Sequence, residues 1–154
     1  MAAKMTKSLP VGKGKIGFKV TNEYAVPVKK LWEAITQAKH TQKYFVDKVT
    51  GDFTPALTPV GWYWKQWGQH YHYPTIFQPE KKLEFRWPDH KKKYLTTVTF
   101  TLRKKGKLIE LEIHERGWKQ ADQKNAFMNC EGWTTFLCYL KAYVQNGVLL
   151  RTKS

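Results

Sequence analysis

The sequence contains no long uninterrupted run of apolar residues. A membrane-spanning helix needs about 20 consecutive apolar residues, and the core of a secretory signal needs about 7 to 15. The N-terminal segment is instead interrupted by lysines at Lys4, Lys7, Lys13, Lys15 and Lys19. We therefore predict a soluble, cytoplasmic protein without a membrane span.

Cysteine is also scarce, with two among 154 residues. Cys130 and Cys138 lie in a segment of helical period, where a rise of about 1.5 Å per residue places their Cα atoms about 12 Å apart. A disulfide requires a Cα separation of about 4.4 to 6.8 Å, so these cysteines cannot pair with each other. Cys130 falls on the apolar side of the segment, which favours a buried structural residue over a catalytic nucleophile, because a nucleophile needs an activating base and access.

Acidic residues are few: 12 Asp and Glu stand against 27 Lys and Arg, which gives a formal net charge of +15. Such an excess is compatible with nucleic acid, an anionic membrane surface or an acidic protein as a partner. The lysines are spread along the chain and no recognised nucleic-acid reading motif is present, so we predict a solvated basic exterior and no specific nucleic-acid binding. An acidic protein stays open as a partner.

The usual signatures of metal and phosphate sites are missing as well. His70 and His72 are two residues apart, so on a strand both rings point to the same side, as zinc or copper ligands can. Spacing reveals no third ligand for them. Residues 12–15 (GKGK) lack the strand and helix that flank a phosphate-binding loop. We predict no metal and no cofactor.

What the sequence does contain is clear periodicity. Residues 1–14 are small, basic and without a period, so we expect a flexible basic N-terminal arm followed by a single domain over residues 15–150. Residues 16–26 alternate as a half-buried strand does. Residues 27–35 carry an apolar stripe of helical period, in which the proline is expected as the first residue. A second short helix is expected around residues 39–45.

The remainder of the chain alternates first as strands and then as one helix. Residues 61–115 repeat a period of two, which predicts an antiparallel sheet with one apolar and one polar face. Gly106, between two lysines, marks a tight hairpin in this region. From about Asn125 to Asn146 the period becomes helical, with an aromatic stripe wide enough to cover the sheet. The predicted fold class is therefore α+β.

Three segments, in this order, are similar to those of one family. Residues 25–36 (AVPVKKLWEAIT) resemble its opening helix, residues 79–87 (PEKKLEFRW) one of its strands, and residues 132–147 (GWTTFLCYLKAYVQNG) its closing helix. Leu31 replaces the usual valine, and Tyr44 stands where a tryptophan is common. The chain thus resembles the Hsp90-ATPase-activator-homologue-like branch of the START-related (SRPBCC, Bet v 1-like) helix-grip superfamily. The resemblance implies a curved antiparallel β-sheet wrapped around a long C-terminal helix, with two short helices after the first strand.

The resemblance also implies a deep, largely apolar cavity between the sheet and the last helix. Strand parity and the helical stripe predict its lining as Trp64, Phe85, Trp87, Phe100, Ile113, Trp133, Phe136 and Leu137. Ligand pockets are commonly lined by aromatic residues, but simple core packing explains the same residues, so both interpretations stay open. Glu115 and Glu131 are the acidic groups considered for this cavity, as ligand-orienting groups or general acids and bases. A surface or capping role is the alternative for each.

These observations favour non-enzymatic binding of a small apolar or aromatic ligand between the sheet and the final helix. Two alternatives stay open. One is a co-chaperone-like protein-interaction module whose basic surface meets an acidic protein. The other is an enzyme of the cyclase or hydrolase type, although no catalytic residue is predicted. The resemblance does not choose among them, because one fold can carry unrelated functions.

Overall fold

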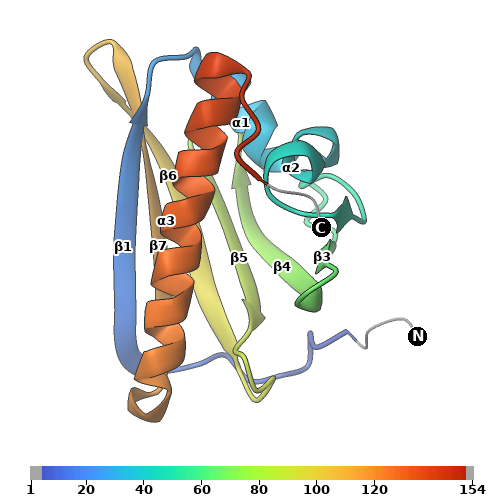
Figure 1. Ribbon diagram of the computed structural model, residues 1–154. Helices are drawn as coiled ribbons and strands as arrows, with labels where there is room; N and C mark the ends of the chain where they lie inside the picture. The colour runs from blue at the N-terminus through green and yellow to red at the C-terminus, as the bar shows by residue number, and fades with distance from the viewer. Residues whose placement is uncertain (1–4, 152–154) are drawn as a thin grey trace.

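The structure of the protein is a computed structural model, and it describes residues 5–151 (Figure 1). The elements in chain order are β1 (Gly14–Tyr24), α1 (Val28–Thr36), α2 (Ala38–Tyr44), β2 (Lys48–Val49), β3 (Val60–Trp64), β4 (Gly68–Gln78), β5 (Lys82–Pro88), β6 (Leu95–Lys105), β7 (Leu108–Gly117), the 3₁₀ helix η1 (Gln120–Asp122) and α3 (Gln123–Asn146). Residues 1–4 of the expected N-terminal arm lie outside the described residues.

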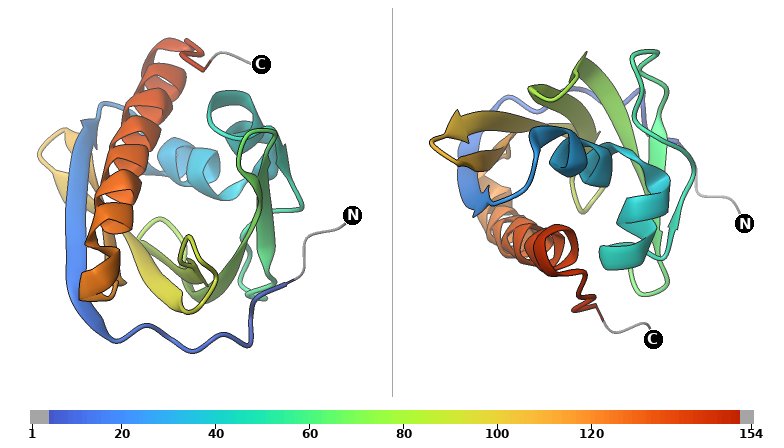
Figure 2. Two further views of the ribbon diagram at one scale, coloured as in Figure 1. Left: turned by 60° about the horizontal axis from the view of Figure 1, so that its bottom comes forward. Right: turned by 90° about the horizontal axis from the view of Figure 1, so that it is seen from above.

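The strands form one seven-stranded antiparallel sheet in the order β1-β7-β6-β5-β4-β3-β2. The sheet curves around α3, which runs beside β1, while α1 and α2 lie at one end (Figures 1 and 2). This is the α+β helix-grip fold predicted from the sequence, with two short helices after the first strand. The long helix begins at Gln123, slightly earlier than expected, and ends at Asn146.

The core lies between the concave face of the sheet and α3. Burial alternates along β7, because successive residues of a strand point to opposite faces. The inward residues of this strand are Ile109, Leu111, Ile113 and Glu115. They meet the buried stripe of α3, which includes Trp133, Phe136, Leu137, Leu140 and Val144. Within residues 5–151, no helix combines the length and the apolar character that crossing a membrane requires.

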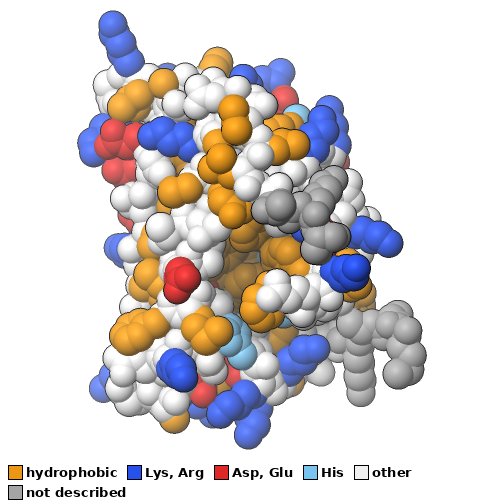
Figure 3. Space-filling model, in the orientation of Figure 1, with side chains coloured by type: hydrophobic (Ala, Val, Ile, Leu, Met, Phe, Trp, Pro, Cys, Tyr) orange, Lys and Arg blue, Asp and Glu red, His pale blue; other side chains and the backbone are white. Residues whose placement is uncertain are grey.

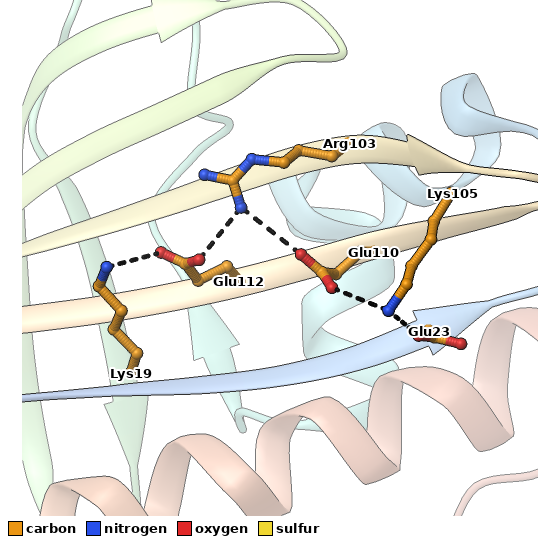
Figure 4. Close-up of polar contacts among 6 residues, drawn as sticks. All are labelled: Lys19, Glu23, Arg103, Lys105, Glu110 and Glu112. Atoms are coloured by element: carbon orange, nitrogen blue, oxygen red, sulfur yellow. Dashed lines mark hydrogen bonds and ion pairs between the residues drawn. The ribbon is translucent and has the colours of Figure 1, made fainter.

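The opposite face of the sheet carries a ladder of ion pairs across β1, β7 and β6 (Figure 4). Its members are Lys19, Glu23, Arg103, Lys105, Glu110 and Glu112. The nitrogen-to-oxygen distances range from 2.8 Å to 3.9 Å. Solvent-exposed pairs of this kind contribute about 0 to 1 kcal/mol each, so the ladder mainly keeps this face polar.

The ends of two helices follow from residues with restricted or unusual backbone angles. The first helix begins at Val28, and Pro27 is the residue before it (φ −58°, ψ 142°) rather than its first residue. At the end of α3, Gly147 adopts the left-handed conformation (φ 64°), which glycine reaches without steric cost.

Close to the described N-terminus, the chain is attached to β6. The N–H of Leu95 donates to the carbonyl of Pro10 at 2.8 Å, and the carbonyl of Leu95 accepts from the N–H of Gly12 at 2.7 Å. A Cβ atom at Gly12 would lie 2.4 Å from the carbonyl oxygen of Gly117. Glycine is therefore required where this segment crosses the end of β7.

The segment after α3 turns back toward α2 (Figure 1). Arg151 donates from Nη1 to the carbonyl oxygen of Val46 at 3.2 Å, and its other terminal nitrogen pairs with the carboxylate of Asp47. Because both partners lie between α2 and β2, this contact joins the end of the described chain to that loop.

Candidate functional site

A fully buried carboxylate lies where the sheet meets α3. Glu115 is 0% exposed, and strand alternation turns it from β7 toward the helix. Its Oε2 accepts hydrogen bonds from the indole of Trp87 at 3.0 Å and the hydroxyl of Thr96 at 2.6 Å. Its Oε1 accepts from the indole of Trp133 at 2.8 Å, and the amide of Asn129 lies within 3.2 Å of both oxygens. The carboxylate thus ties β5, β6 and α3 to β7.

The protonation of Glu115 reflects a balance between burial and these donors. Burial raises the pKa of the carboxyl above its ordinary value, and the hydrogen bonds from its neighbours oppose that rise. An ionised carboxylate offers about four lone-pair sites, so the four donor groups occupy its capacity. A general acid or base must reach a substrate proton, and Glu115 is instead arranged as a structural anchor.

A hydrogen-bonded path connects Glu115 to the surface. The Oδ1 atom of Asn129 lies 2.7 Å from Nε2 of His90, an exposed residue. An amide oxygen only accepts, so the imidazole nitrogen donates here. The side-chain amide of Asn129 is therefore held on both sides, by a surface imidazole and by the buried carboxylate.

Aromatic rings fill the space between β3, β4, β5 and α3. The ring of Trp62 is central, and its centroid lies 5.9 Å from that of Phe45 and 4.3 Å from that of His72. On the helix side, the ring centroids of Trp133 and Phe136 each lie 6.3 Å from the ring centroid of Trp62. The contacts are edge-on, tilted and stacked, so the elements meet through a continuous aromatic cluster.

Four rings of this cluster stay half-buried, and we call them the aromatic rim: Phe45, Trp64, His70 and Trp87. The centroid distances are 5.6 Å from Phe45 to Trp64, 5.5 Å from Trp64 to His70, and 6.3 Å from His70 to Trp87. Figure 3 shows hydrophobic atoms in a hollow between α3 and the side of the sheet that carries β3 and β4. The aromatic rim lies on this side of the molecule.

All eight residues expected to line the cavity belong to this one cluster. Six are buried, namely Phe85, Phe100, Ile113, Trp133, Phe136 and Leu137, while Trp64 and Trp87 are half-buried. The buried rings are in contact, with centroids 5.8 Å apart for Phe85 and Phe100 and 5.4 Å apart for Phe100 and Trp133. These separations are those of rings in contact within one cluster.

Two surface pockets of the described chain lie elsewhere. One, of about 460 Å³, is bordered by residues 25–28 and by the β6–β7 hairpin. The other, of about 350 Å³, is bordered by α1 and by residues 52–55. Neither is lined by any of the eight residues, so the expected ligand cavity stays a prediction.

Glu131 does not share the environment of Glu115. It is exposed on α3, so of the two roles considered for Glu131 the structure favours the surface one. At about 100° per residue, Glu131 is about 200° around the helix from the buried Trp133. Cys130 is half-buried rather than buried, and Cys138 is exposed; both are free thiols.

His72 is a residue of the site whose role its spacing from His70 does not indicate. It is fully buried, and its Nδ1 lies 2.9 Å from the carbonyl oxygen of Val60. Residues 5–151 form no group of three or more His, Cys, Asp or Glu that could hold a metal ion. Strand parity is the signal that indicates its position, since His72 pairs with Val60 across β3 and β4 and therefore faces the same side as Trp62.

A curved sheet that grips a C-terminal helix, with a buried carboxylate and an aromatic cluster between them, defines a helix-grip protein. The family described as "Activator of Hsp90 ATPase homolog 1-like protein" matches residues 25–145, and the chain belongs to this family. No curated protein matches the chain.

Several solved structures share the fold at low sequence identity. Protein MLL2253 from Mesorhizobium loti has a TM-score of 0.76 and 22% identity, over 87% of this chain and 100% of that one. The Aha1 dimer from Colwellia psychrerythraea has a TM-score of 0.75 and 16% identity, over 86% and 98%. DynU16, a protein in the dynemicin biosynthetic locus, has a TM-score of 0.73 and 19% identity over 88% of this chain. This chain covers 49% of DynU16, about half its length, and such identities show the fold alone.

Proposed function

We propose that the protein binds a small apolar or aromatic molecule, without catalysing a reaction on it, in the hollow edged by the aromatic rim. The observation that carries this proposal is that four half-buried rings, each in contact with the next, lie directly beside the buried rings of the aromatic cluster. Ligand sites are typically concave and lined by aromatic side chains with few polar groups. A flat ligand would extend the ring contacts that the cluster already makes.

The electrostatics of the aromatic rim favour an uncharged ligand. Burial lowers the pKa of His70, so its imidazole is neutral near pH 7. The indole N–H of Trp64 donates to the carbonyl of Phe45 at 2.9 Å, which leaves its ring faces as the contact surface. The nearest buried acid, Glu115, has its acceptor capacity filled by protein donors, which supports binding rather than acid–base catalysis.

Calorimetric titration with an uncharged bicyclic aromatic compound, 2-methoxynaphthalene, tests this proposal. Saturable one-site binding is expected for the wild type. Trp64→Ala should weaken it about tenfold, since a well-packed aromatic contact contributes on the order of one factor of ten. Trp67→Ala is the matched control, because this indole is 63% exposed on the same β3–β4 hairpin. Absence of saturable binding, or an equal loss in both variants, would contradict the proposal.

A protein-interaction role is the second candidate, favoured by the net charge of +15 and by the family description. A basic exterior would steer the protein toward an acidic partner. Sedimentation velocity with an acidic chaperone of the Hsp90 type, at about 150 mM salt, where the Debye length is about 8 Å, tests it. A stable complex under these conditions would place this role first, and sedimentation of two separate species would argue against it.

A further inference from the structure

Two buried polar atoms of the aromatic cluster have no hydrogen-bond partner: Nε1 of Trp62 and Nε2 of His72. The two residues are 1% and 0% exposed and lie on neighbouring strands, β3 and β4. Buried polar atoms are nearly always paired in folded proteins, so two unpaired atoms in touching rings require an explanation.

The chemistry of the two atoms is complementary. The Nδ1 atom of His72 lies 2.9 Å from the carbonyl oxygen of Val60, and because a carbonyl only accepts, Nδ1 carries the proton. In the neutral ring, Nε2 is then a hydrogen-bond acceptor. The indole Nε1–H of Trp62 is a donor only. Burial lowers the pKa of His72 to about 3, so the neutral ring persists through the physiological range.

The donor and the acceptor do not satisfy each other, although their ring centroids are 4.3 Å apart. The rings are inclined by 54°, and no direct hydrogen bond joins the two nitrogens. Three other indoles of the cluster are paired: Trp64 donates to a backbone carbonyl, and Trp87 and Trp133 donate to Glu115. Trp62 is therefore an exception within its own surroundings.

The remaining unpaired buried atoms within the described part of the chain differ from this pair. They are Nε2 of Gln69, Nε of Arg86 and Nε1 of Trp118, and all three are donors. Among these unpaired atoms only Nε2 of His72 is an acceptor, and the ring of His72 contacts the ring of Trp62, which carries an unpaired donor. The pair is thus suited to one group that both accepts and donates.

We infer that Trp62 and His72 form a polar subsite for one hydroxyl group of the ligand, which accepts from Trp62 Nε1–H and donates to His72 Nε2. A carboxylate has no proton to donate to Nε2, and its lone pairs would repel the lone pair of that nitrogen. An ammonium group has no lone pair to accept the indole N–H. An ether oxygen accepts from the indole N–H but cannot donate to Nε2. This inference rests on the proposed function and narrows its ligand to a hydroxylated compound.

The surroundings of the subsite favour an aromatic carrier for that hydroxyl. Phe85 and Trp87 contact the ring of His72 with centroids 4.6 Å and 5.0 Å away, and Phe53 lies 5.8 Å away. Trp87 also belongs to the aromatic rim, so the subsite and the rim share a ring. A phenolic compound matches both the apolar rings and the polar pair.

Calorimetric titration with two matched probes, 2-naphthol and 2-methoxynaphthalene, tests the inference on the wild-type protein. The first probe can donate and accept, whereas the second only accepts. The wild type should bind 2-naphthol about tenfold more tightly, the factor expected for one added hydrogen bond. In His72→Phe the ratio of the two affinities should fall toward one, because only 2-naphthol donates to Nε2. Trp62→Phe should weaken the binding of both probes, since each accepts from the indole N–H, and should leave the ratio close to the wild-type value. Trp118→Phe is the control, since it removes an unpaired indole N–H from a separate cluster and should leave the ratio unchanged.

The outcomes separate this inference from the proposed function. Equal wild-type affinities for the two probes would overturn the subsite and leave apolar binding intact, as expected if a trapped water satisfies the pair. Binding of neither probe would overturn the proposed function and the subsite with it. The ratio of the wild-type affinities for the two probes tests the subsite even if a variant fails to fold. Thermal unfolding of each variant shows whether that variant is folded.

Discussion

Trp133 on α3 donates its indole N–H to Glu115 on β7 across 2.8 Å, so a buried hydrogen bond joins the long helix to the sheet. The same carboxylate accepts from Trp87 and Thr96 on two further strands. The interior of the grip is therefore held by polar bonds as well as by ring packing. This arrangement makes the carboxylate a point on which several elements depend.

Replacing Glu115 by alanine should lower the free energy of unfolding by about 3 to 5 kcal/mol. Several buried donors would lose their acceptor, and each unsatisfied group costs about 1 to 3 kcal/mol before relaxation. Guanidinium unfolding measures the change. Glu131→Ala is the control, because its exposed carboxylate should contribute less than about 0.5 kcal/mol. Equal effects of the two substitutions would show that Glu115 is not an anchor.

Trp133→Ala distinguishes a packed core from a roomy cavity. The residue is 2% exposed and its ring contacts several others, so the substitution should cost about 3 to 5 kcal/mol through lost burial and a new void. Urea unfolding measures the cost, with Trp67→Ala as the exposed control. A loss below about 1 kcal/mol would mean that the ring has open space around it, in conflict with close packing.

Acidification should destabilise the protein through His72. Burial lowers the pKa of this ring from 6.5 to about 3 in the folded state. The unfolded chain therefore takes up a proton that the folded protein does not, and the contribution of the neutral ring is full above about pH 6.5 and is lost as the pH falls toward 3. Unfolding at a series of pH values should show this fall, and His72→Phe should make it shallower. Parallel curves for the two proteins would refute the assignment.

DNA binding, if detected, should be weak and strongly dependent on salt. A solvated lysine-rich exterior binds phosphates through counterion release alone, so the affinity should drop steeply between about 50 and 200 mM salt. Fluorescence anisotropy with two unrelated duplexes of equal length measures both the slope and the selectivity. Sequence-selective binding that persists at the higher salt concentration would contradict a non-specific basic surface.

Local pattern is enough to predict the inward position of Glu115, because it follows Ile109, Leu111 and Ile113 at alternate positions of one strand. Local pattern does not predict the groups that donate hydrogen bonds to this carboxylate. Thr96 and Asn129 become neighbours of the carboxylate only through the β6–β7 register and the placement of α3. No short-range period encodes those two relationships, so the network could not be read from the sequence.

Glu131 and His72 show where residue type leaves a choice that position decides. The helical period that buries Trp133 also turns Glu131 outward, so of the interior and surface roles considered for Glu131 the surface role follows from its position. Imidazoles two apart suggest a metal pair, yet backbone pairing with Val60 and burial give His72 a different role. The division into a basic arm and a domain over residues 15–150 stays a prediction.

The contact between Arg151 and the loop after α2 joins segments that are 105 positions apart in the sequence. Val46 and Asp47, its partners, directly follow Phe45 of the aromatic rim. The last described residue therefore holds the backbone next to one ring of the rim, although it lies far from that ring along the chain. Shortening the C-terminal segment removes this support, so a change at the end of the chain acts beside Phe45.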